Sequence, residues 1–240
     1  MVHIHDARER RAERGTIPPD HFIPAVEQSM LARPFTAHVL SLATKEWMEN
    51  EVPGRLAVNC PPALLSDPAT PSLVRRALAA SAFPPERLVL EVTERARLDG
   101  VSNITERGGR LREMGFRIAV DDLGAGYSGL TSFAALEPDF IKLDIEGGEV
   151  AALRGLSRPV GALSFEYVPG ARDEALACID TLERLGPYRY NWSPGETMRL
   201  ALPEWCDAAG MRAFIAGSGD QQGDIYGRLT TAPEGPGARR

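Results

Sequence analysis

Four short apolar runs, each ending in polar residues, divide the first 145 residues of the chain. They are Leu56-Ala-Val-Asn59, Leu88-Val-Leu-Glu-Val-Thr-Glu94, Ile118-Ala-Val-Asp-Asp122 and Phe140-Ile-Lys-Leu-Asp144. Short apolar runs bounded by turn residues are typical of buried strands. Apolar residues at helical spacing lie between them, over 72–82 and 104–114, and an earlier helical pattern covers 25–50 after a proline-rich loop at 17–24. This pattern predicts alternating strands and helices.

The polar residues at the strand ends favour one arrangement of these strands. Asn59 and Glu91 are 32 residues apart, Glu91 and Asp121 are 30 apart, and Asp121 and Lys142 are 21 apart. One βα unit takes about 30 residues, so a parallel sheet or a barrel is expected. A (β/α)8 barrel builds its active site from the ends of several strands, whereas an open doubly wound sheet uses one switch point. We therefore expect residues 1–145 to form a partial TIM-like barrel.

The pattern changes after Asp144, and the fold class remains α/β with antiparallel edge strands. We expect a short helix over 145–156, a strand over 162–168 and a helix over 172–185. Two β-like segments, 188–192 and 197–202, flank a Ser-Pro-Gly turn and are expected to pair as antiparallel strands. A helix over 204–216, a strand over 224–229 and a flexible Pro/Gly/Ala/Arg tail over 230–240 complete this part.

Composition and charge narrow the classes of partner. The chain has 240 residues, of which 43% are hydrophobic and 25% charged, and its net charge is −6. A globular protein of one large or two small domains is expected. The acidic balance argues against DNA, RNA or anionic lipid as a partner through a broad basic surface. Only two lysines occur, Lys45 and Lys142, and the one at a strand end is a candidate for a compact functional charge.

The cysteines and the apolar segments bear on localisation. The three cysteines, Cys60, Cys178 and Cys206, are widely spaced and form neither a disulfide framework nor a zinc-like pattern. No stretch reaches the roughly 18 apolar residues that a membrane helix requires, and the first 15 residues lack the apolar core of a signal peptide. We expect a cytoplasmic protein without a membrane segment.

The strand-end residues suggest a metal site. Asn59, Glu91, Asp121 and Asp122 form an all-oxygen donor set, and hard oxygen donors select Mg2+ or Mn2+. Such ions can bind a phosphodiester and activate a water molecule, and Lys142 could hold that water or a phosphate oxygen. The alternative interpretation is that each carboxylate only caps a helix or ends a strand.

Five ordered motifs resemble those of the EAL family, a family of metal-dependent phosphodiesterases that linearise cyclic di-GMP. The motifs lie within residues 2–145 and are Ile17-Pro-Pro-Asp-His-Phe-Ile-Pro24, Val58-Asn-Cys-Pro61, Leu90-Glu-Val-Thr-Glu94, Asp121-Asp-Leu-Gly-Ala-Gly-Tyr-Ser128 and Ile141-Lys-Leu-Asp144. The resemblance implies that the four oxygen-bearing residues named above are metal ligands. It also implies that Lys142 is catalytic together with Glu91 and Asp122, and that Glu94 stabilises the Asp-Asp loop.

The first strand departs from the family pattern. The namesake Glu-Ala-Leu would fall near Asp6-Ala-Arg8, so Asp6 would replace a metal-binding glutamate with a shorter carboxylate. Arg10 would then stand where the family places a phosphate-binding arginine. Nothing after Asp144 resembles the last three strands of the family, so the resemblance covers an incomplete barrel.

The C-terminal part resembles the later half of FkbM-type methyltransferases, which use S-adenosylmethionine. The residues that carry this resemblance lie between about 140 and 229 and include Leu143-Asp-Ile-Glu-Gly-Gly-Glu-Val150, Leu163-Ser-Phe-Glu-Tyr-Val-Pro169, Tyr188-Arg-Tyr-Asn191 and Gly223-Asp-Ile-Tyr226. The glycine-rich loop and the acidic ribose-binding residue of that family have no counterpart. The domain prediction is thus an EAL-like part over 1–145 and a methyltransferase-like segment over 146–229.

Three functional hypotheses remain at this point. The chain hydrolyses cyclic di-GMP to the linear dinucleotide with Mg2+ or Mn2+, or it is a degenerate EAL-type protein that binds cyclic di-GMP without catalysis. The alternative is a methyltransferase fragment that binds S-adenosylmethionine. An incomplete barrel leaves sheet edges uncovered, which allows a homodimer.

Overall fold

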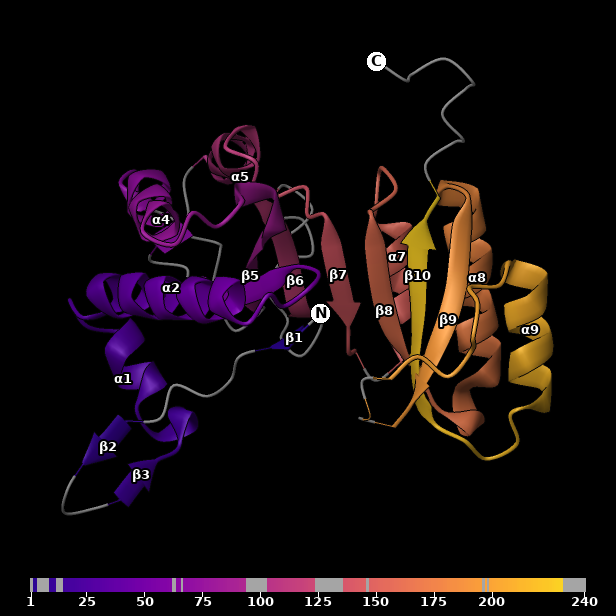
Figure 1. Cartoon of the computed structure of the whole chain (residues 1–240). Helices are drawn as coiled ribbons and strands as arrows, with labels where there is room; N and C mark the ends of the chain where they lie inside the picture. The colour runs from indigo at the N-terminus through magenta and orange to yellow at the C-terminus, as the bar shows by residue number, and fades with distance from the viewer. Residues whose placement is uncertain are drawn as a thin grey trace. The chain divides into compact units, whose positions relative to one another are not determined.

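A computed structural model describes residues 2–3, 9–11, 15–61, 64–65, 67–93, 103–123, 136–145, 147–195, 197 and 199–230 (Figure 1). The chain divides into two compact units. Unit 1 comprises Met1–Val120 and Ala135–Pro138, and unit 2 comprises Asp121–Ala134 and Asp139–Arg240. The predicted Glu94, the Asp6 position and most of the C-terminal tail lie outside the described residues.

Unit 1 contains a sheet with the order β1-β4-β5-β6. These strands are β1 (Val2–His3), β4 (Leu56–Asn59), β5 (Leu88–Thr93) and β6 (Arg117–Leu123). Residues 117–120 of β6 belong to unit 1. β1 and β4 are parallel, and so are β4 and β5. The first five residues of β5 are all buried, as expected for a strand that is covered on both faces.

The described helices of unit 1 differ in length and pack against the sheet and against one another. The longest are α2 (Ala32–Glu49), α4 (Thr70–Ala79) and α5 (Ile104–Glu113), and the short ones are η1 (Pro19–His21), α1 (Ile23–Glu27) and η2 (Pro85–Arg87). α2 contacts both β4 and α4. The Ser81 hydroxyl, just after α4, donates to Thr44 Oγ1 of α2 at 2.9 Å, which joins the two helices by a part-buried polar contact.

A separate two-stranded antiparallel sheet precedes these helices. It pairs β2 (Glu9–Arg11) with β3 (Gly15–Ile17), and the backbone of Arg10 lies opposite Thr16. The parallel strand that adjoins β4 is instead Val2–His3. Residues 4–8, which hold the altered first-strand motif, lie outside the described residues.

Unit 2 contains a mixed sheet. Its strands follow the order β7 (Phe140–Leu143), β8 (Ala162–Tyr167), β10 (Gly223–Leu229) and β9 (Tyr188–Pro194). β7 and β8 are parallel, whereas β10 is antiparallel to both β8 and β9. The predicted antiparallel character of the edge strands is therefore present in this unit.

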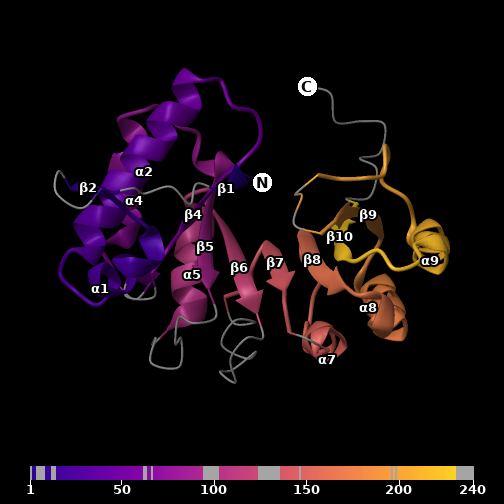
Figure 2. The same ribbon diagram turned by 90° about the horizontal axis from the view of Figure 1, so that it is seen from below.

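Three helices lie on one face of this sheet: α7 (Glu149–Arg154), α8 (Arg172–Leu185) and α9 (Ala208–Gly217) (Figure 2). A short η4 (Pro169–Ala171) joins β8 to α8. The side chains that face the helices are almost fully buried, among them Phe165, Tyr167, Tyr190, Trp192 and Ile225. Because successive residues of a strand point to opposite faces, the other face carries the polar series Lys142, Ser164, Glu166, Asn191, Asp224 and Tyr226.

Most predicted elements of the C-terminal part are confirmed, with one correction. α8 has the predicted bounds, and β8 and β10 differ from the predicted strands by one residue at one end. The prediction of a strand over 197–202 that pairs with 188–192 is wrong, because β9 pairs with β10 instead. The described residues near Leu202 are held by Asn191, whose side chain donates to Leu202 O and accepts from Leu202 N. The backbone of β9 also binds this loop, since Ala201 N donates to Trp192 O at 2.8 Å, but no second strand forms there among the described residues.

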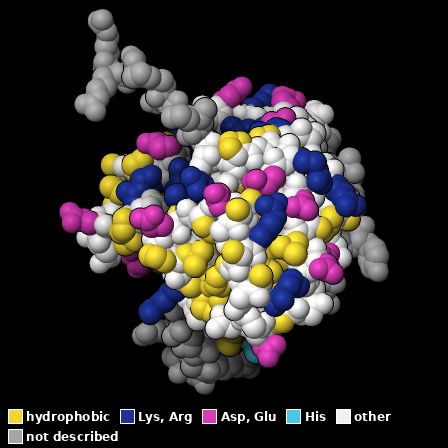
Figure 3. Space-filling model, turned by 90° about the vertical axis from the view of Figure 1, so that its right-hand side faces the viewer, with side chains coloured by type: hydrophobic (Ala, Val, Ile, Leu, Met, Phe, Trp, Pro, Cys, Tyr) yellow, Lys and Arg dark blue, Asp and Glu magenta, His cyan; other side chains and the backbone are white. Residues whose placement is uncertain are grey.

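The described helices and the surface bear on the predictions for membrane and nucleic-acid partners. Within the described residues, no helix is both long and apolar enough to span a membrane. The face shown in Figure 3 mixes basic, acidic and hydrophobic side chains rather than presenting one broad patch of a single charge.

At the start of the predicted tail, Thr230 N donates to Pro187 O at 2.8 Å, and the residues after it lie outside the described part.

Candidate functional site

Two of the predicted metal ligands lie side by side in unit 1. Asn59 ends β4 and is paired in register with Glu91 of the parallel strand β5. Neighbouring strands lie about 4.8 Å apart, and paired residues point to the same face. The backbone of β5 also binds the chain after β4, since Cys60 N donates to Glu91 O at 2.7 Å. The local fold therefore places an amide and a carboxylate together at the end of β4.

Glu91 and Asn59 differ in their exposure. Glu91 is only 4% exposed, and burial of a carboxylate is costly because it removes the charge from water. Asn59 is exposed and lines a small cavity of about 110 Å3 with residues of α1 and α2. A carboxylate and an amide oxygen are both hard donors of the type that divalent cations prefer.

Lys142 lies beside Asp121 in unit 2. Its ammonium Nζ is 3.7 Å from Asp121 Oδ1 and 3.8 Å from Asp144 Oδ2. The Asp121 side chain is 18% exposed and that of Lys142 is 38% exposed, so solvent weakens these ion pairs. Their main effect is geometric, because the two carboxylates hold the ammonium at the end of β7.

Two residues near Lys142 were not singled out from the sequence. Lys142 is in register with Ser164 of β8, which is in register with Tyr226 of β10. The pKa of Tyr226 is raised by burial and by the charge of Asp224, and the positive charge of Lys142 opposes this rise. The period-two alternation of β8 and β10 was the signal that could have identified Ser164 and Tyr226 as residues on the face of Lys142.

The remaining predicted site residues are described only in part or not at all. Asp122 lies in β6 and Arg10 in β2, but their side chains lie outside the described part of the chain. Asp6 and Glu94 lie outside the described residues entirely. The roles of these four residues stay predictions.

The donor chemistry of the described residues fits an oxygen-binding cation in part. Asn59 and Glu91 supply two adjacent oxygen donors, which are the donor type that Mg2+ and Mn2+ prefer. Among the described residues, no group of three or more His, Cys, Asp or Glu side chains is placed to hold a metal ion. A complete ligand set would therefore have to include residues beyond the described pair.

A family model for the EAL domain matches residues 7–146, which is more than half of the chain. This chain belongs to the EAL-domain family. An uncharacterized signaling protein of Caulobacter vibrioides is 38% identical over 57% of the chain and 17% of its own length. The probable cyclic di-GMP phosphodiesterase PdeB of Escherichia coli is 28% identical over 58% of the chain and 27% of its own length. A cyclic di-GMP phosphodiesterase of Pseudomonas aeruginosa is 33% identical over 57% of the chain and 24% of its own length.

Solved EAL structures share the fold of this EAL-family chain. The PaMucR phosphodiesterase in complex with c-di-GMP has a TM-score of 0.55 and 23% identity, covering 90% of this chain and 78% of that chain. The FimX EAL domain of Pseudomonas aeruginosa bound to c-di-GMP has a TM-score of 0.55 and 21% identity, covering 74% and 66% of the two chains.

This EAL-family chain spans only part of the length of the curated relatives that it matches. The alignments cover about a sixth to a quarter of the lengths of the Caulobacter and Escherichia relatives named above. None of these matches supports the methyltransferase resemblance of residues 140–229. Family membership and an α/β fold with parallel strands are thus established, and the activity is a matter for proposal.

Proposed function

We propose that this chain is a metal-dependent cyclic di-GMP phosphodiesterase that produces the linear dinucleotide. The observation that carries the proposal is the in-register pair of Asn59 and the 4% exposed Glu91 at the end of β4. The family membership of residues 7–146 and relatives named as cyclic di-GMP phosphodiesterases support it.

The proposed roles follow from the donor chemistry of each residue. Asn59 and Glu91, together with Asp121, Asp122 and Asp6, would bind Mg2+ or Mn2+, as the family resemblance implies. When bound, such a cation lowers the pKa of a coordinated water and neutralises charge on a phosphodiester. Hydrolysis forms a bond from the water oxygen to phosphorus and breaks one ester bond, and the leaving sugar oxygen takes up a proton.

The polar side chains of the protein would orient the reactants. The Lys142 ammonium, held by Asp121 and Asp144, can donate hydrogen bonds to the attacking water or to a phosphate oxygen. Arg10 would bind a phosphate by the same resemblance, because a guanidinium matches the geometry of phosphate oxygens. Glu94 would stabilise the Asp121-Asp122 loop.

Hydrolysis of cyclic di-GMP with Mn2+ tests this proposal. Glu91→Gln and Lys142→Ala should each lower the rate by about 100-fold or more, the usual cost of removing one group that stabilises a transition state. Matched controls are Glu113→Gln, an exposed carboxylate on α5, and Lys45→Ala, which removes the other lysine of the chain. Equal rates in the wild type and in both site variants would refute catalysis by these residues.

Calorimetry separates hydrolysis from simple binding. Binding of cyclic di-GMP without turnover would assign the chain to the non-catalytic receptors that the altered Asp6-Ala-Arg8 motif allows. Absence of binding at millimolar ligand would remove both functions. The homodimer and the cytoplasmic localisation stay predictions, and sedimentation of the purified chain measures the first.

Methyl transfer is a second candidate with much weaker support. The observation that favours it is the mixed order β8-β10-β9, which has the antiparallel edge strands expected from the C-terminal resemblance. S-adenosylmethionine would then raise the unfolding temperature of the chain, because a ligand that binds the native state stabilises it. Unchanged unfolding at millimolar cofactor would exclude this function.

A further inference from the structure

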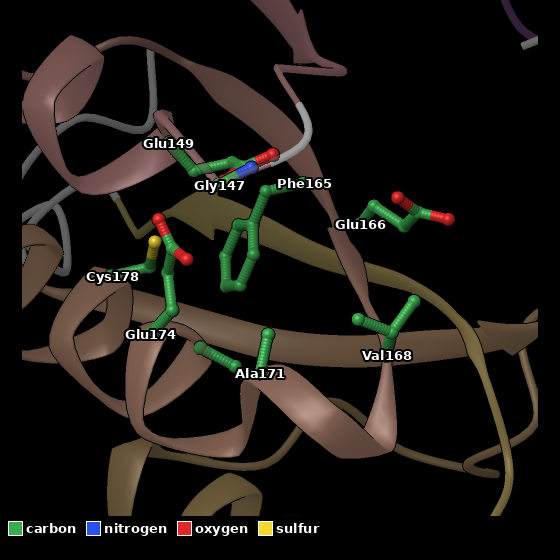
Figure 4. A pocket seen from close by; sticks show the side chains of 9 residues that line it. Gly147, Glu149, Phe165, Glu166, Val168, Ala171, Glu174 and Cys178 are labelled. Carbon is green, nitrogen blue, oxygen red and sulfur yellow. The ribbon is translucent and has the colours of Figure 1, made fainter.

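A cavity of about 490 Å3 lies in unit 2 beyond the carboxyl ends of β7 and β8 (Figure 4). Gly147 and Glu149 line it from the segment that follows β7, and Phe165 and Val168 line it from the end of β8. Glu174 and Cys178 line it from α8. Open α/β sheets bind ligands outside the carboxyl ends of their parallel strands, and this volume is in the range of small-molecule sites.

Glu149 is a fixed anion at one wall of the cavity. It is only 5% exposed, and its two carboxylate oxygens accept hydrogen bonds from Ile145 N at 3.2 Å and Gly147 N at 3.1 Å. A carboxyl group whose two oxygens both accept hydrogen bonds is held in one orientation. Glu149 thus brings a negative charge into the interior and shapes the loop after β7.

Glu174 places a second carboxyl group against the first. The pKa of Glu174 is raised by burial, by the charge of Glu149 and by a hydrogen bond between the two side chains. The carboxyl of Glu174 also approaches the loop, since a Cβ added at Gly147 would lie 3.5 Å from Glu174 Oε2. The two carboxyl groups therefore converge on one end of the cavity. No basic side chain among the described lining residues neutralises their negative charge.

Cys178 adds a buried thiol to the same end of the cavity. Its side chain is completely buried, and burial raises its pKa to about 12, with smaller contributions from Glu149 and Glu174. Figure 4 shows its sulfur beside the carboxyl of Glu174. A neutral buried S–H therefore faces the same space as the carboxyl pair and supplies no positive charge to compensate it.

The lining separates into an acidic end and an apolar wall. Among the described residues that line the cavity, none is basic. Glu166 is also a lining residue, but its carboxylate points away from Glu149 and Glu174 (Figure 4). Phe165, Val168, Ala171 and Ala175 supply apolar surface. We propose that this cavity binds a small organic cation, an amine or amidinium with an apolar body, whose charge is compensated by Glu174 and Glu149.

This cavity shares no lining residue with the proposed phosphodiesterase site. All of its lining residues lie beyond residue 146, where the match to the EAL model ends. The cation proposal therefore stands or fails without reference to hydrolysis of cyclic di-GMP.

Three probes of similar shape and different charge test the proposal on the full chain. They are benzamidine, which is a cation, benzyl alcohol, which is neutral, and benzoate, which is an anion. Calorimetry and ligand-observed NMR should show binding of benzamidine and no binding of benzoate. Glu174→Gln should weaken benzamidine binding by about tenfold or more, the usual value of a charge-assisted contact. The matched control Asp173→Asn removes the neighbouring exposed carboxylate of α8, which does not line the cavity, and should bind like the wild type.

A steric variant keeps the test decisive if Glu174→Gln changes the fold. The larger side chain of Ala171→Leu would fill part of the cavity without changing its charge. This variant should abolish benzamidine binding while the circular dichroism spectrum stays the same. Three results would overturn the proposal. They are equal affinity for all three probes, wild-type affinity in both cavity variants, and absence of benzamidine binding at about 10 mM, which is weaker than the millimolar affinities expected of small fragments.

Discussion

The strands of the two units bury their side chains differently, and the difference helps to interpret the carboxylates that they carry. In unit 1, β5 is buried at five consecutive positions, and one of them is Glu91. In unit 2, β10 alternates between buried and half-buried positions, and Asp224 is on the half-buried face. A carboxylate inside a doubly covered strand costs free energy unless something compensates its charge, whereas one on a half-open face is solvated. The position of Glu91 therefore depends more on compensating interactions than the position of Asp224 does.

The same contrast applies to the groups beside each carboxylate. Glu91 has the amide of Asn59 as its register neighbour, which suits a shared cation. Glu149 has instead the carboxyl of Glu174 beside it, and the pKa of Glu174 is raised by burial and by the charge of Glu149. The first arrangement suits a metal, and the second suits an organic cation in a cavity with an apolar wall.

Substitutions in the core of each unit should have the largest effect on the free energy of unfolding. Leu88→Ala in β5 and Ile225→Ala in β10 each remove a side chain that is fully buried, and each should lower the free energy of unfolding by about 2 to 5 kcal/mol. Urea unfolding, followed by the fluorescence of Trp47 in unit 1 and Trp192 in unit 2, measures the change. If either substitution costs less than about 1 kcal/mol, the core that contains it is wrongly placed.

Two glycines offer the next comparison. A Cβ at Gly223 of β10 would overlap Ser193 O and lie 2.9 Å from Gly195 N, so Gly223→Ala should destabilise the chain by about 1 to 3 kcal/mol. A Cβ at Gly109 in α5 would meet no atom within 4 Å, so Gly109→Ala should stabilise it by about 0.5 to 1 kcal/mol. Thermal unfolding measures both, and shifts of the same sign would contradict the close packing of β9 and β10.

Capping distinguishes α9 in unit 2 from α2 in unit 1. Asp207 Oδ1 accepts from Gly210 N at 2.8 Å at the start of α9, whereas Leu31 at the start of α2 provides no such bond. Asp207→Ala should cost about 1 kcal/mol, while Leu31→Ala should change stability little at the cap. Chemical unfolding of the two variants provides the comparison, and equal losses would argue against the cap.

The smallest effect depends on pH. Because the pKa of Glu174 is raised in the folded chain, the folded state binds the proton more tightly than the unfolded state does. Its contribution is present below the ordinary pKa of glutamate and is lost as the pH rises through the raised value. Glu174→Gln should therefore match the wild type near pH 4 and exceed it at pH 7 by roughly 0.5 kcal/mol or less, since the group is partly exposed. A constant difference across this pH range would show that the pKa of Glu174 is not raised in the folded chain.

Local patterns were sufficient for elements whose signals lie within one segment. The bounds of α8 were predictable because acidic residues occupy its first turn, apolar residues recur through Leu182, and Gly186 follows its end. The register of Asn59 with Glu91 also agrees with the prediction that strand ends carry the polar side chains. The predicted strand over 197–202 failed because its alternation resembled a strand while the true partner of β9 came from residues 223–229.

The sequence by itself determined the family, the alternation of strands and helices, and the residue types at the ends of β4, β5 and β7. Only the tertiary structure decided that β10 lies between β8 and β9, and that Glu149 and Glu174 meet beside the thiol of Cys178 at one end of a cavity. The physical reason is that helical and strand periodicity is a property of neighbouring residues. Strand order and the meeting of two acids on separate helices depend on burying surfaces that are distant in the chain.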